Sequence, residues 1–316
     1  MNKKMKFGFI DAHADTITAA INKNTGLFEN DLHIDLNRLG EFKYPIVQVF
    51  AIYLADEHLN NAFTYANKVI DFFEKELASH NDLIRIALSL EEIEKNTRNG
   101  ISSAILALEG GETLEGKIQN LHHFYNRGVR LITLTWNYEN ELAYGVGTES
   151  INGLKPFGIE VVEKMNELGI IVDVSHLNKA GFWDVDRIST RPYIASHSNA
   201  HAITPHRRNL NDDQIKAIVK KGGFIGINLY PPFIGTEGVA DKNSILNHIN
   251  HFSDLGVLDF VGLGCDFDGV DRLPEGITDV SSLKEIAELL TVNLGADKSE
   301  AIMSLNFYEF LKRFFN

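Results

Sequence analysis

Short apolar runs recur along this chain with room for a helix between most neighbours, and this alternation limits the folds open to it. Most of the runs are rich in Val, Ile or Phe, which is typical of strands buried on both faces of a parallel sheet. The eight runs are residues 7–10, 46–53, 104–108, 129–134, 170–174, 193–195, 224–229 and 260–263. They predict eight parallel strands.

Amphipathic stretches between the runs predict helices. Residues 156–168 open with a proline, which suits the first turn of a helix. In 211–222, Asn211 is suited to cap the helix and Gly222 to end it. Further helices are predicted at 61–79, 116–127, 178–187, 243–255, 282–294 and 298–315.

A strand–helix unit repeated eight times favours the α/β class and a closed (β/α)8 barrel of the TIM type. We expect one domain over residues 1–316, with the active site at the C-terminal ends of the strands. The alternative is an open, doubly wound sheet. No Gly-x-Gly-x-x-Gly motif follows the first run to support that alternative.

Composition narrows the range of partners and compartments. The 316 residues carry a formal net charge of -13, which disfavours nucleic acid and anionic membranes as partners. The one cysteine, Cys265, excludes an internal disulfide and a cysteine-rich zinc site. The first ten residues contain no long apolar run, so we expect neither a signal peptide nor a membrane anchor, and a cytoplasmic protein.

Histidines and carboxylates follow the C-terminal ends of five predicted strands. They are His13, Asp15, Glu109, His176, His197, Asp266 and Asp268. A barrel brings these ends to one face, so the side chains should converge. One metal ion rarely needs so many protein ligands, whereas a pair of ions does. Imidazole and carboxylate without thiolate suit zinc best, and manganese or cobalt also fit.

Local patterns around these residues sharpen the hypothesis. His13 and Asp15 are two residues apart, so an extended backbone points them to one side. Glu109 precedes two glycines, which let backbone approach closely. Asp268 either forms part of a turn or supports a ligand without binding the metal itself. Arg208 follows the sixth run, beside Arg207, and is a candidate clamp for a substrate carboxylate; Tyr230 is a candidate hydroxyl donor at the same rim.

Six motifs together resemble the membrane (renal) dipeptidase family, the M19 peptidases, which belong to the amidohydrolase-like metal-dependent barrels. In chain order, they are "DAHADT", "LALEGGE", "GVRLITLTWNYEN", "VDVSH", "ASHSNAHAITPHRRNL" and "GLGCDFDGVDRLPEGITDV". Each motif alone is weak, but their order and spacing are specific and cover nearly the whole chain.

The resemblance implies a dinuclear zinc dipeptidase that hydrolyses free dipeptides and tolerates a D-residue at the C-terminal position. The implied ligands are His13 and Asp15 on one ion, Glu109 bridging, and His176 and His197 on the other. The resemblance also implies that Arg208 contacts the substrate carboxylate and that Asp266 is the catalytic acid and base. A homodimer is a further expectation from the family.

One position departs from the family pattern. Familiar mammalian members place a substrate-contacting histidine after "LTLT", and here that residue is Trp136. Tryptophan has one donor and carries no charge, so the substrate contacts at this position must differ. Two other functions stay open: a different amide or lactone hydrolase with the same metal pair, and a metal-binding barrel without catalysis. The additional carboxylate of Asp266 argues against the second.

Overall fold

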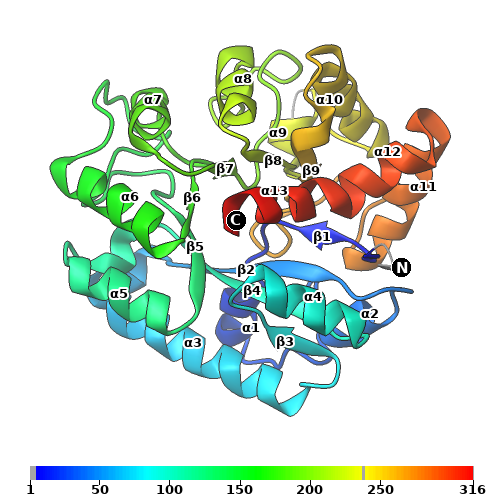
Figure 1. The fold of residues 1–316 in the computed structure, drawn as a ribbon, viewed down its shortest axis with the longest axis horizontal. Helices are drawn as coiled ribbons and strands as arrows, with labels where there is room; N and C mark the ends of the chain where they lie inside the picture. Colours follow the sequence, from blue (N-terminus) through cyan, green and yellow to red (C-terminus); the bar gives the residue numbers. More distant parts are fainter. Residues whose placement is uncertain (1–4, 237–238, 316) are drawn as a thin grey trace.

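A closed barrel of eight parallel strands forms the centre of the computed structural model, which describes residues 5–236 and 239–315 (Figure 1). The strands run in the order β2-β1-β9-β8-β7-β6-β5-β4, and the pairing of β2 with β4 closes the sheet. They are β1 (Ile10–Asp11), β2 (Val47–Tyr53), β4 (Ser102–Glu109), β5 (Val129–Thr133), β6 (Ile171–Asp173), β7 (Ile194–Ala195), β8 (Phe224–Ile227) and β9 (Val261–Leu263). The barrel predicted from the alternating pattern is confirmed.

A ninth strand, β3 (Ile84–Ile86), lies outside the barrel. It pairs with the first residues of β4, and β5 pairs with the later residues on the same edge. The sequence analysis did not predict β3, because it has only three residues and its central Arg85 is exposed.

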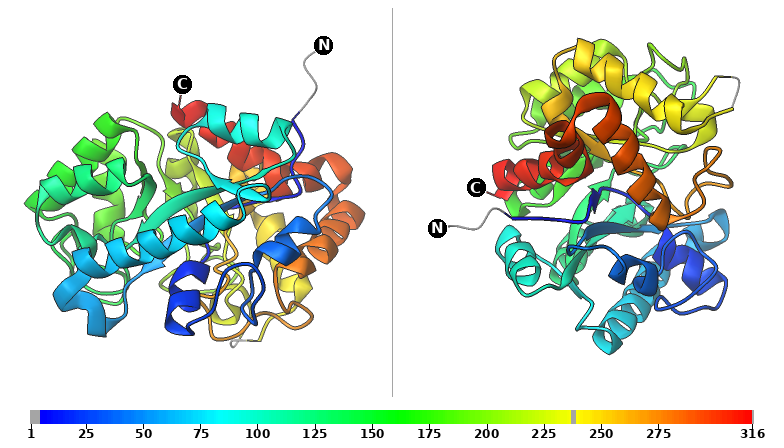
Figure 2. Two further views of the ribbon diagram at one scale, coloured as in Figure 1. Left: turned by 90° about the horizontal axis from the view of Figure 1, so that it is seen from below. Right: turned by 90° about the vertical axis from the view of Figure 1, so that its right-hand side faces the viewer.

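Helices surround the barrel in both views of Figure 2. The α-helices are α1 (Thr16–Asn22), α2 (Leu36–Gly40), α3 (Ala62–Ser79), α4 (Leu90–Arg98), α5 (Ile118–Asn126), α6 (Pro156–Leu168), α7 (Lys179–Ile188), α8 (Asp212–Lys220), α9 (Pro231–Ile234), α10 (Lys242–Asp254), α11 (Leu283–Leu294), α12 (Ala296–Glu300) and α13 (Asn306–Phe315). Short 3-10 helices lie at Asp56–Asn61, Gly111–Leu114, Leu258–Phe260 and Val280–Ser282.

Two of the predicted helices show how local sequence sets their ends. Asn211 caps α8 as expected, in a reciprocal capping box with Gln214. The helix predicted over 298–315 is instead divided, because a π-helical segment at Ala301–Leu305 separates α12 from α13. No helix in the described residues is long and apolar enough to cross a lipid bilayer.

The side chains of the strands divide into an interior and an exterior apolar cluster. On β4, Ile105 and Ala107 belong to the interior cluster, while Leu106 and Leu108 pack outward against the helices. Successive residues of a strand point to opposite faces, so Glu109 continues the inward series at the C-terminal end of β4. The barrel therefore presents this carboxylate to its own axis.

Helix α13 closes the opposite end of the barrel. Phe307, Phe310 and Phe314 of this helix belong to the interior cluster, together with Phe224 of β8. Figure 1 shows α13 across the middle of the barrel, and Figure 2 shows it beside α4 at one end. The N-terminal end of the barrel is thus filled with side chains. The prediction of one domain over residues 1–316 extends beyond the described ranges and stays a prediction.

We expect Phe310→Ala to lower the free energy of unfolding by about 3–5 kcal/mol, because it removes a fully buried ring from the closed end. Glu309→Ala, at an exposed position of the same helix, is the matched control and should change stability by less than about 0.5 kcal/mol. Urea denaturation with chelator present measures both. Equal effects of the two substitutions would show that α13 does not need this ring.

Candidate functional site

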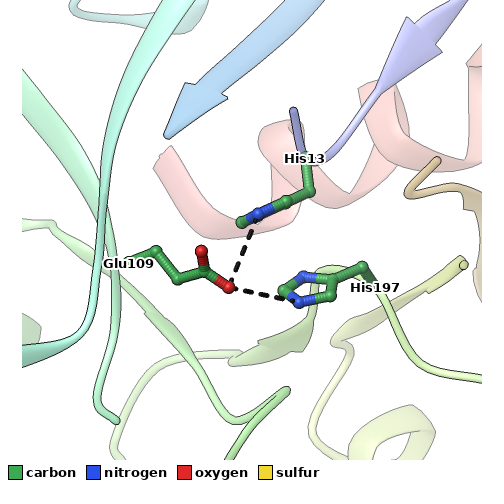
Figure 3. Close-up of side chains that lie close together, drawn as sticks. All are labelled: His13, Glu109 and His197. Atoms are coloured by element: carbon green, nitrogen blue, oxygen red, sulfur yellow. Dashed lines mark ion pairs between the residues drawn. The ribbon is translucent and has the colours of Figure 1, made fainter. Parts of the chain in front are cut away.

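The carboxylate of Glu109 lies against three imidazole rings at the C-terminal end of the barrel. Its Oε1 atom is 2.9 Å from Nε2 of His176. The same oxygen is 3.5 Å from Nε2 of His197 and 3.7 Å from Nε2 of His13 (Figure 3). All four side chains are buried. The convergence expected from strand ends far apart in the sequence is therefore present.

Asp15 and Asp266 complete the cluster on the side of His13. Nε2 of His13 is 3.4 Å from Oδ2 of Asp15 and 3.9 Å from Oδ1 of Asp266. Two groups of ligand atoms lie mutually within 4.8 Å, and both include His13: one adds Glu109 and His197, the other Asp15 and Asp266. Asp266 is therefore also within reach of an ion held by His13 and Asp15.

Two parallel backbone segments hold these residues together. The amide of Asp266 donates to the carbonyl of His13 at 3.2 Å, and the amide of Asp15 donates to the carbonyl of Phe267 at 2.9 Å. Asp266 has a φ of 62°, a left-handed conformation that is uncommon outside glycine. A Cβ on Gly269 would come within 2.1 Å of Oδ2 of Asp15, so only glycine allows the loop to pass this closely.

Asp268 supports this loop and does not join the cluster. It also adopts a left-handed backbone, with a φ of 66°. Its carboxylate accepts hydrogen bonds from Oγ1 of Thr16 at 2.6 Å and from the amide of His33 at 2.7 Å. Its own amide donates to Nδ1 of His33 at 2.9 Å. Asp268 therefore joins the loop after β9 to the segments around α1.

The tautomer of His176 shows that the cluster fits a cation. Nδ1 of His176 lies 3.0 Å from Oδ1 of Asn137, and an amide oxygen can only accept, so Nδ1 carries the proton. Nε2 then presents a lone pair to Oε1 of Glu109, 2.9 Å away. Two acceptors in contact repel each other unless a cation lies at their junction. Both ring nitrogens of His13 and Oδ1 of Asp15 are also buried without a hydrogen-bond partner among the described residues.

The pKa values of the three histidines shift in different directions. Burial, reinforced by the charge of Arg208, lowers the pKa of His176 to about 4. Burial also lowers the pKa of His197 well below its usual value, so both rings are neutral near pH 7. Burial alone would lower the pKa of His13 as well, but the charges of Glu109 and Asp15 outweigh it and raise that pKa. Metal ions bind the unprotonated form of imidazole.

The carboxylates show that the centre lacks positive charge. Burial and the neighbouring charge of Glu109 raise the pKa of Asp15 to about 8. Burial raises the pKa of Asp266 as well. Burial opposes ionisation of Glu109, yet its contacts with His13 and His176 lower its pKa below the usual range. Divalent cations would supply the missing charge, and this donor set of nitrogen and oxygen without sulfur suits zinc, manganese or cobalt.

An open cavity of about 590 Å³ leads to the cluster. Asp15, Glu109, His176 and Asp266 line its inner part. Aromatic residues form another part of its lining, namely Tyr53, Trp136, Tyr230 and Phe233. The rings of Trp136 and Tyr53 meet edge to face, with centroids 5.1 Å apart. Trp136 and Tyr230 therefore lie where a ligand of the cluster would touch them.

Arg208 lies next to the cluster but does not line the main cavity. It is buried and lines a separate cavity of about 260 Å³ together with Arg207. Its guanidinium donates to the carbonyls of Ser175 and His197, two buried residues that follow shortly after the ends of β6 and β7. It reaches the cluster through Nη2, 3.2 Å from Nε2 of His176. Arg208 thus touches the cluster from the side of a neighbouring cavity, and its role as a carboxylate clamp stays a prediction.

Asn228 is a site residue that the sequence analysis missed. Its Nδ2 donates to Oδ2 of Asp266 at 2.8 Å, and its Oδ1 accepts from the amide of Tyr230 at 2.6 Å. The available signal was its position, since Asn228 directly follows β8 just as His197 follows shortly after β7. An amide side chain, unlike a histidine, does not by itself indicate a metal or catalytic site. Asn137, which lines the cavity and holds His176, was missed for the same reason.

Comparisons with known proteins agree with this site. The sequence model of a family described as membrane dipeptidase, peptidase family M19, matches residues 4–313. The solved structure of dipeptidase AC, a metallopeptidase of family M19, has a TM-score of 0.91 and 27% identity, covering 98% of this chain and 99% of that chain.

Two further proteins are similar to this chain. A metallopeptidase from Rhodobacter sphaeroides, whose structure holds a phosphinate mimic of the dipeptide L-Ala-D-Ala, has a TM-score of 0.89 and 27% identity, with the same coverage of both chains. A protein of Schizosaccharomyces pombe named as a dipeptidase is 34% identical over 236 residues, which are 72% of this chain and 56% of that protein.

Metal binding to this cluster should release protons. The pKa of Asp15 is raised to about 8 and that of His13 is also raised, so the metal-free pair retains protons at pH 7 that a bound ion must displace. We expect the apparent affinity for zinc to increase from about pH 6 to about pH 8. Calorimetric titration in buffers of different ionisation enthalpy measures the release, and Asp15→Asn should reduce it. Equal affinity at all these pH values, with no proton release, would contradict the assignment.

Proposed function

Because this chain belongs to the membrane dipeptidase family, peptidase family M19, and is a metal-dependent dipeptidase, we propose that it works with two divalent ions, most simply zinc. The observation that carries this proposal is the buried carboxylate of Glu109 in contact with three imidazoles at the inner end of an open cavity. In proteins, a site with this many nitrogen and oxygen donors suits a pair of ions with a shared carboxylate.

We assign the ligands as the family resemblance implies. His13 and Asp15 hold one ion, Glu109 bridges, and His176 and His197 hold the second. The contacts of Glu109 with histidines of both sets support its bridging role. When bound, such a pair of ions activates water and polarises the carbonyl group of the substrate.

Asp266 is the proposed acid and base. Its Oδ2 is held by Asn228, while Oδ1 faces His13 at the inner part of the cavity. Burial raises the pKa of Asp266, which brings the carboxylate closer to the pH at which it can both take and return a proton. In this role it removes a proton from the attacking water and returns one to the leaving amine.

The substrate we propose is a free dipeptide, with a D-residue tolerated at its C-terminal position. The relative from Rhodobacter sphaeroides was solved with a mimic of L-Ala-D-Ala, which supports a ligand of this size and stereochemistry. Trp136 and Tyr230 line the cavity and are the proposed substrate contacts. The indole of Trp136 can pack against a side chain but cannot carry charge as the family histidine does.

A panel of dipeptides and lactones tests the function as a whole. Release of amino acids from L-Ala-D-Ala and L-Ala-L-Ala, lost on chelation and restored by zinc, is the expected result. Faster cleavage of lactones or of other amides would favour the alternative hydrolase, and bound metal without any turnover would favour a non-catalytic barrel. The cytoplasmic location, the homodimer and the absence of a nucleic-acid partner stay predictions.

Asp266→Asn should lower kcat by about 10²–10⁴-fold, because the amide keeps the shape of the side chain but cannot take a proton. Metal analysis of the purified variant must accompany the rate measurement, since Asp266 also lies within reach of an ion. A variant that keeps both its metal content and its kcat would show that another group moves the proton.

Arg208 remains the proposed contact for the substrate carboxylate: Nη1 and Nη2 contact backbone carbonyls, while its buried Nε has no hydrogen-bond partner among the described residues. A charge-assisted hydrogen bond contributes about 1.5–3 kcal/mol, so its loss should lower kcat/KM about ten- to a hundredfold. Arg208→Lys keeps the charge but not the planar fork. We therefore compare a dipeptide with its C-terminal amide on the wild type and on Arg208→Lys.

The wild type should prefer the free acid, and Arg208→Lys should lose most of this preference. The ratio of kcat/KM for the acid to kcat/KM for the amide cancels any general loss of activity that the substitution causes. If the ratio is the same in both proteins, Arg208 stays on the backbone carbonyls and does not read the end of the substrate.

A further inference from the structure

One polar layer interrupts the apolar interior of the barrel directly below the cluster. Leu131, Ile171 and Ile194 of β5, β6 and β7 belong to the interior cluster. The side chains two residues further on point to the same inward face, and these are Thr133, Asp173 and Ser196. Strand pairing brings them into one layer, with Thr133 opposite Asp173 and Asp173 opposite Ile194. A buried carboxylate in a barrel interior is costly, so its partners indicate its role.

Asp173 is fully buried and accepts five hydrogen bonds. Oδ1 accepts from the amide and the hydroxyl of Ser175, at 3.1 and 2.7 Å, and from the amide of Ser196 at 2.9 Å. Oδ2 accepts from the hydroxyls of Ser196 and Thr133, each at 2.6 Å. The carboxylate therefore fixes the direction of the hydroxyl protons around it.

These fixed protons determine the tautomer of His197. Oγ of Ser196 lies 2.7 Å from Nδ1 of His197, and its only proton already points to Asp173. The hydroxyl of Ser175 also donates to Asp173, so it does not supply a proton to Ser196. Oγ of Ser196 must therefore accept from Nδ1 of His197, which leaves Nε2 unprotonated. This Nε2 faces Nε2 of His176 at 2.8 Å and Oε1 of Glu109 at 3.5 Å, and a cation between these acceptors would hold them together.

The main chain of His197 is held by the same carboxylate. Its amide donates to Oγ of Ser175 at 3.1 Å, and that hydroxyl is oriented by Asp173. His197 is thus fixed at both its backbone and its ring. His176 differs, because its Nδ1 donates to the neutral amide of Asn137 on the cavity wall.

We propose that Asp173 is a positioning residue for the metal centre: acting through the hydroxyls of Ser196 and Ser175, it holds His197 with Nε2 free to bind an ion. This inference rests on the proposed metal pair. A carboxylate that reaches a ligand histidine through its second nitrogen fixes the ring and raises its basicity as a ligand. Here one hydroxyl lies between the two groups.

Ser196→Ala is the test, because it removes the link and keeps the backbone amide that donates to Asp173. Thr133→Val is the matched control, since it removes an equally short hydrogen bond to the same oxygen of Asp173 but not the link to His197. Zinc affinity is measured for each metal-free protein by competition with a chromophoric chelator. We expect Ser196→Ala to weaken one of the two ions about 10–100-fold and Thr133→Val to bind both as the wild type does.

A second readout does not depend on metal. Two-bond ¹H–¹⁵N spectra of metal-free protein, with His197 identified from the signal missing in His197→Gln, distinguish the two imidazole tautomers. The wild type and Thr133→Val should show His197 protonated at Nδ1, and Ser196→Ala should lose that preference.

Three results would overturn the inference. The first is a Ser196→Ala variant that binds zinc as tightly as the wild type. The second is an equal loss of zinc affinity in Ser196→Ala and Thr133→Val. The third is a wild-type His197 that is protonated at Nε2. A wild type that binds no second ion, by contrast, overturns the proposed metal pair and this inference with it. The affinity of the wild type therefore distinguishes the two failures.

Discussion

The contact between the buried carboxylate of Glu109 and three imidazole nitrogens is the interaction on which the whole site depends. These residues are far apart in sequence, and the barrel brings them together, because Glu109 is the last residue of β4 while the histidines follow β1, β6 and β7. Closing a parallel sheet brings those ends to one mouth. A buried carboxylate without compensating charge is strongly unfavourable. The fold that assembles the cluster therefore also favours the binding of cations to it.

The interior of the barrel is arranged in successive layers of increasing polarity. Aromatic rings of α13 fill one end, and aliphatic side chains such as Ile171 follow. Asp173 and its hydroxyl partners form the next layer, and the histidines and carboxylates lie above it at the open cavity. The hydrogen bonds of the Asp173 layer reach His197 above it, so this ring is supported from within the barrel. His176 and Asp266, in contrast, are supported by amides near the cavity, Asn137 and Asn228.

The barrel and the ligand cluster were predictable because both depend on patterns of residue type. Apolar runs mark strands, and a histidine or carboxylate directly after such a run must lie at the mouth of a barrel. Strand β3 was not predictable in this way, since three residues with an exposed centre give no pattern. The π-helical segment between α12 and α13 has no counterpart in the apolar pattern, which therefore predicts one helix there.

The direction of individual side chains could not be predicted from the sequence. The residue type of Arg208 predicts a cation near the mouth of the barrel. It does not predict that two backbone carbonyls hold the guanidinium next to His176. Asn228 and Asn137 were missed because an amide gains a role here only through the group that it faces. Asp173 was missed because it lies within a strand, where a polar residue pointing into the barrel cannot be told from one at a helix contact.

The position of Arg208 has an electrostatic consequence that does not depend on substrate. Burial is the largest cause of the lowered pKa of His176 and His197, and the positive charge of Arg208 lowers both further. Because backbone carbonyls hold the guanidinium, it does not form an ion pair with Glu109 that would take this carboxylate out of the cluster. The arginine therefore adds to the effect of burial that keeps two imidazoles neutral, while the carboxylate of Glu109 stays in contact with them. An ion entering the centre then meets lone pairs on the side of His176 and His197, and negative charge on the side of Asp15 and Asp266.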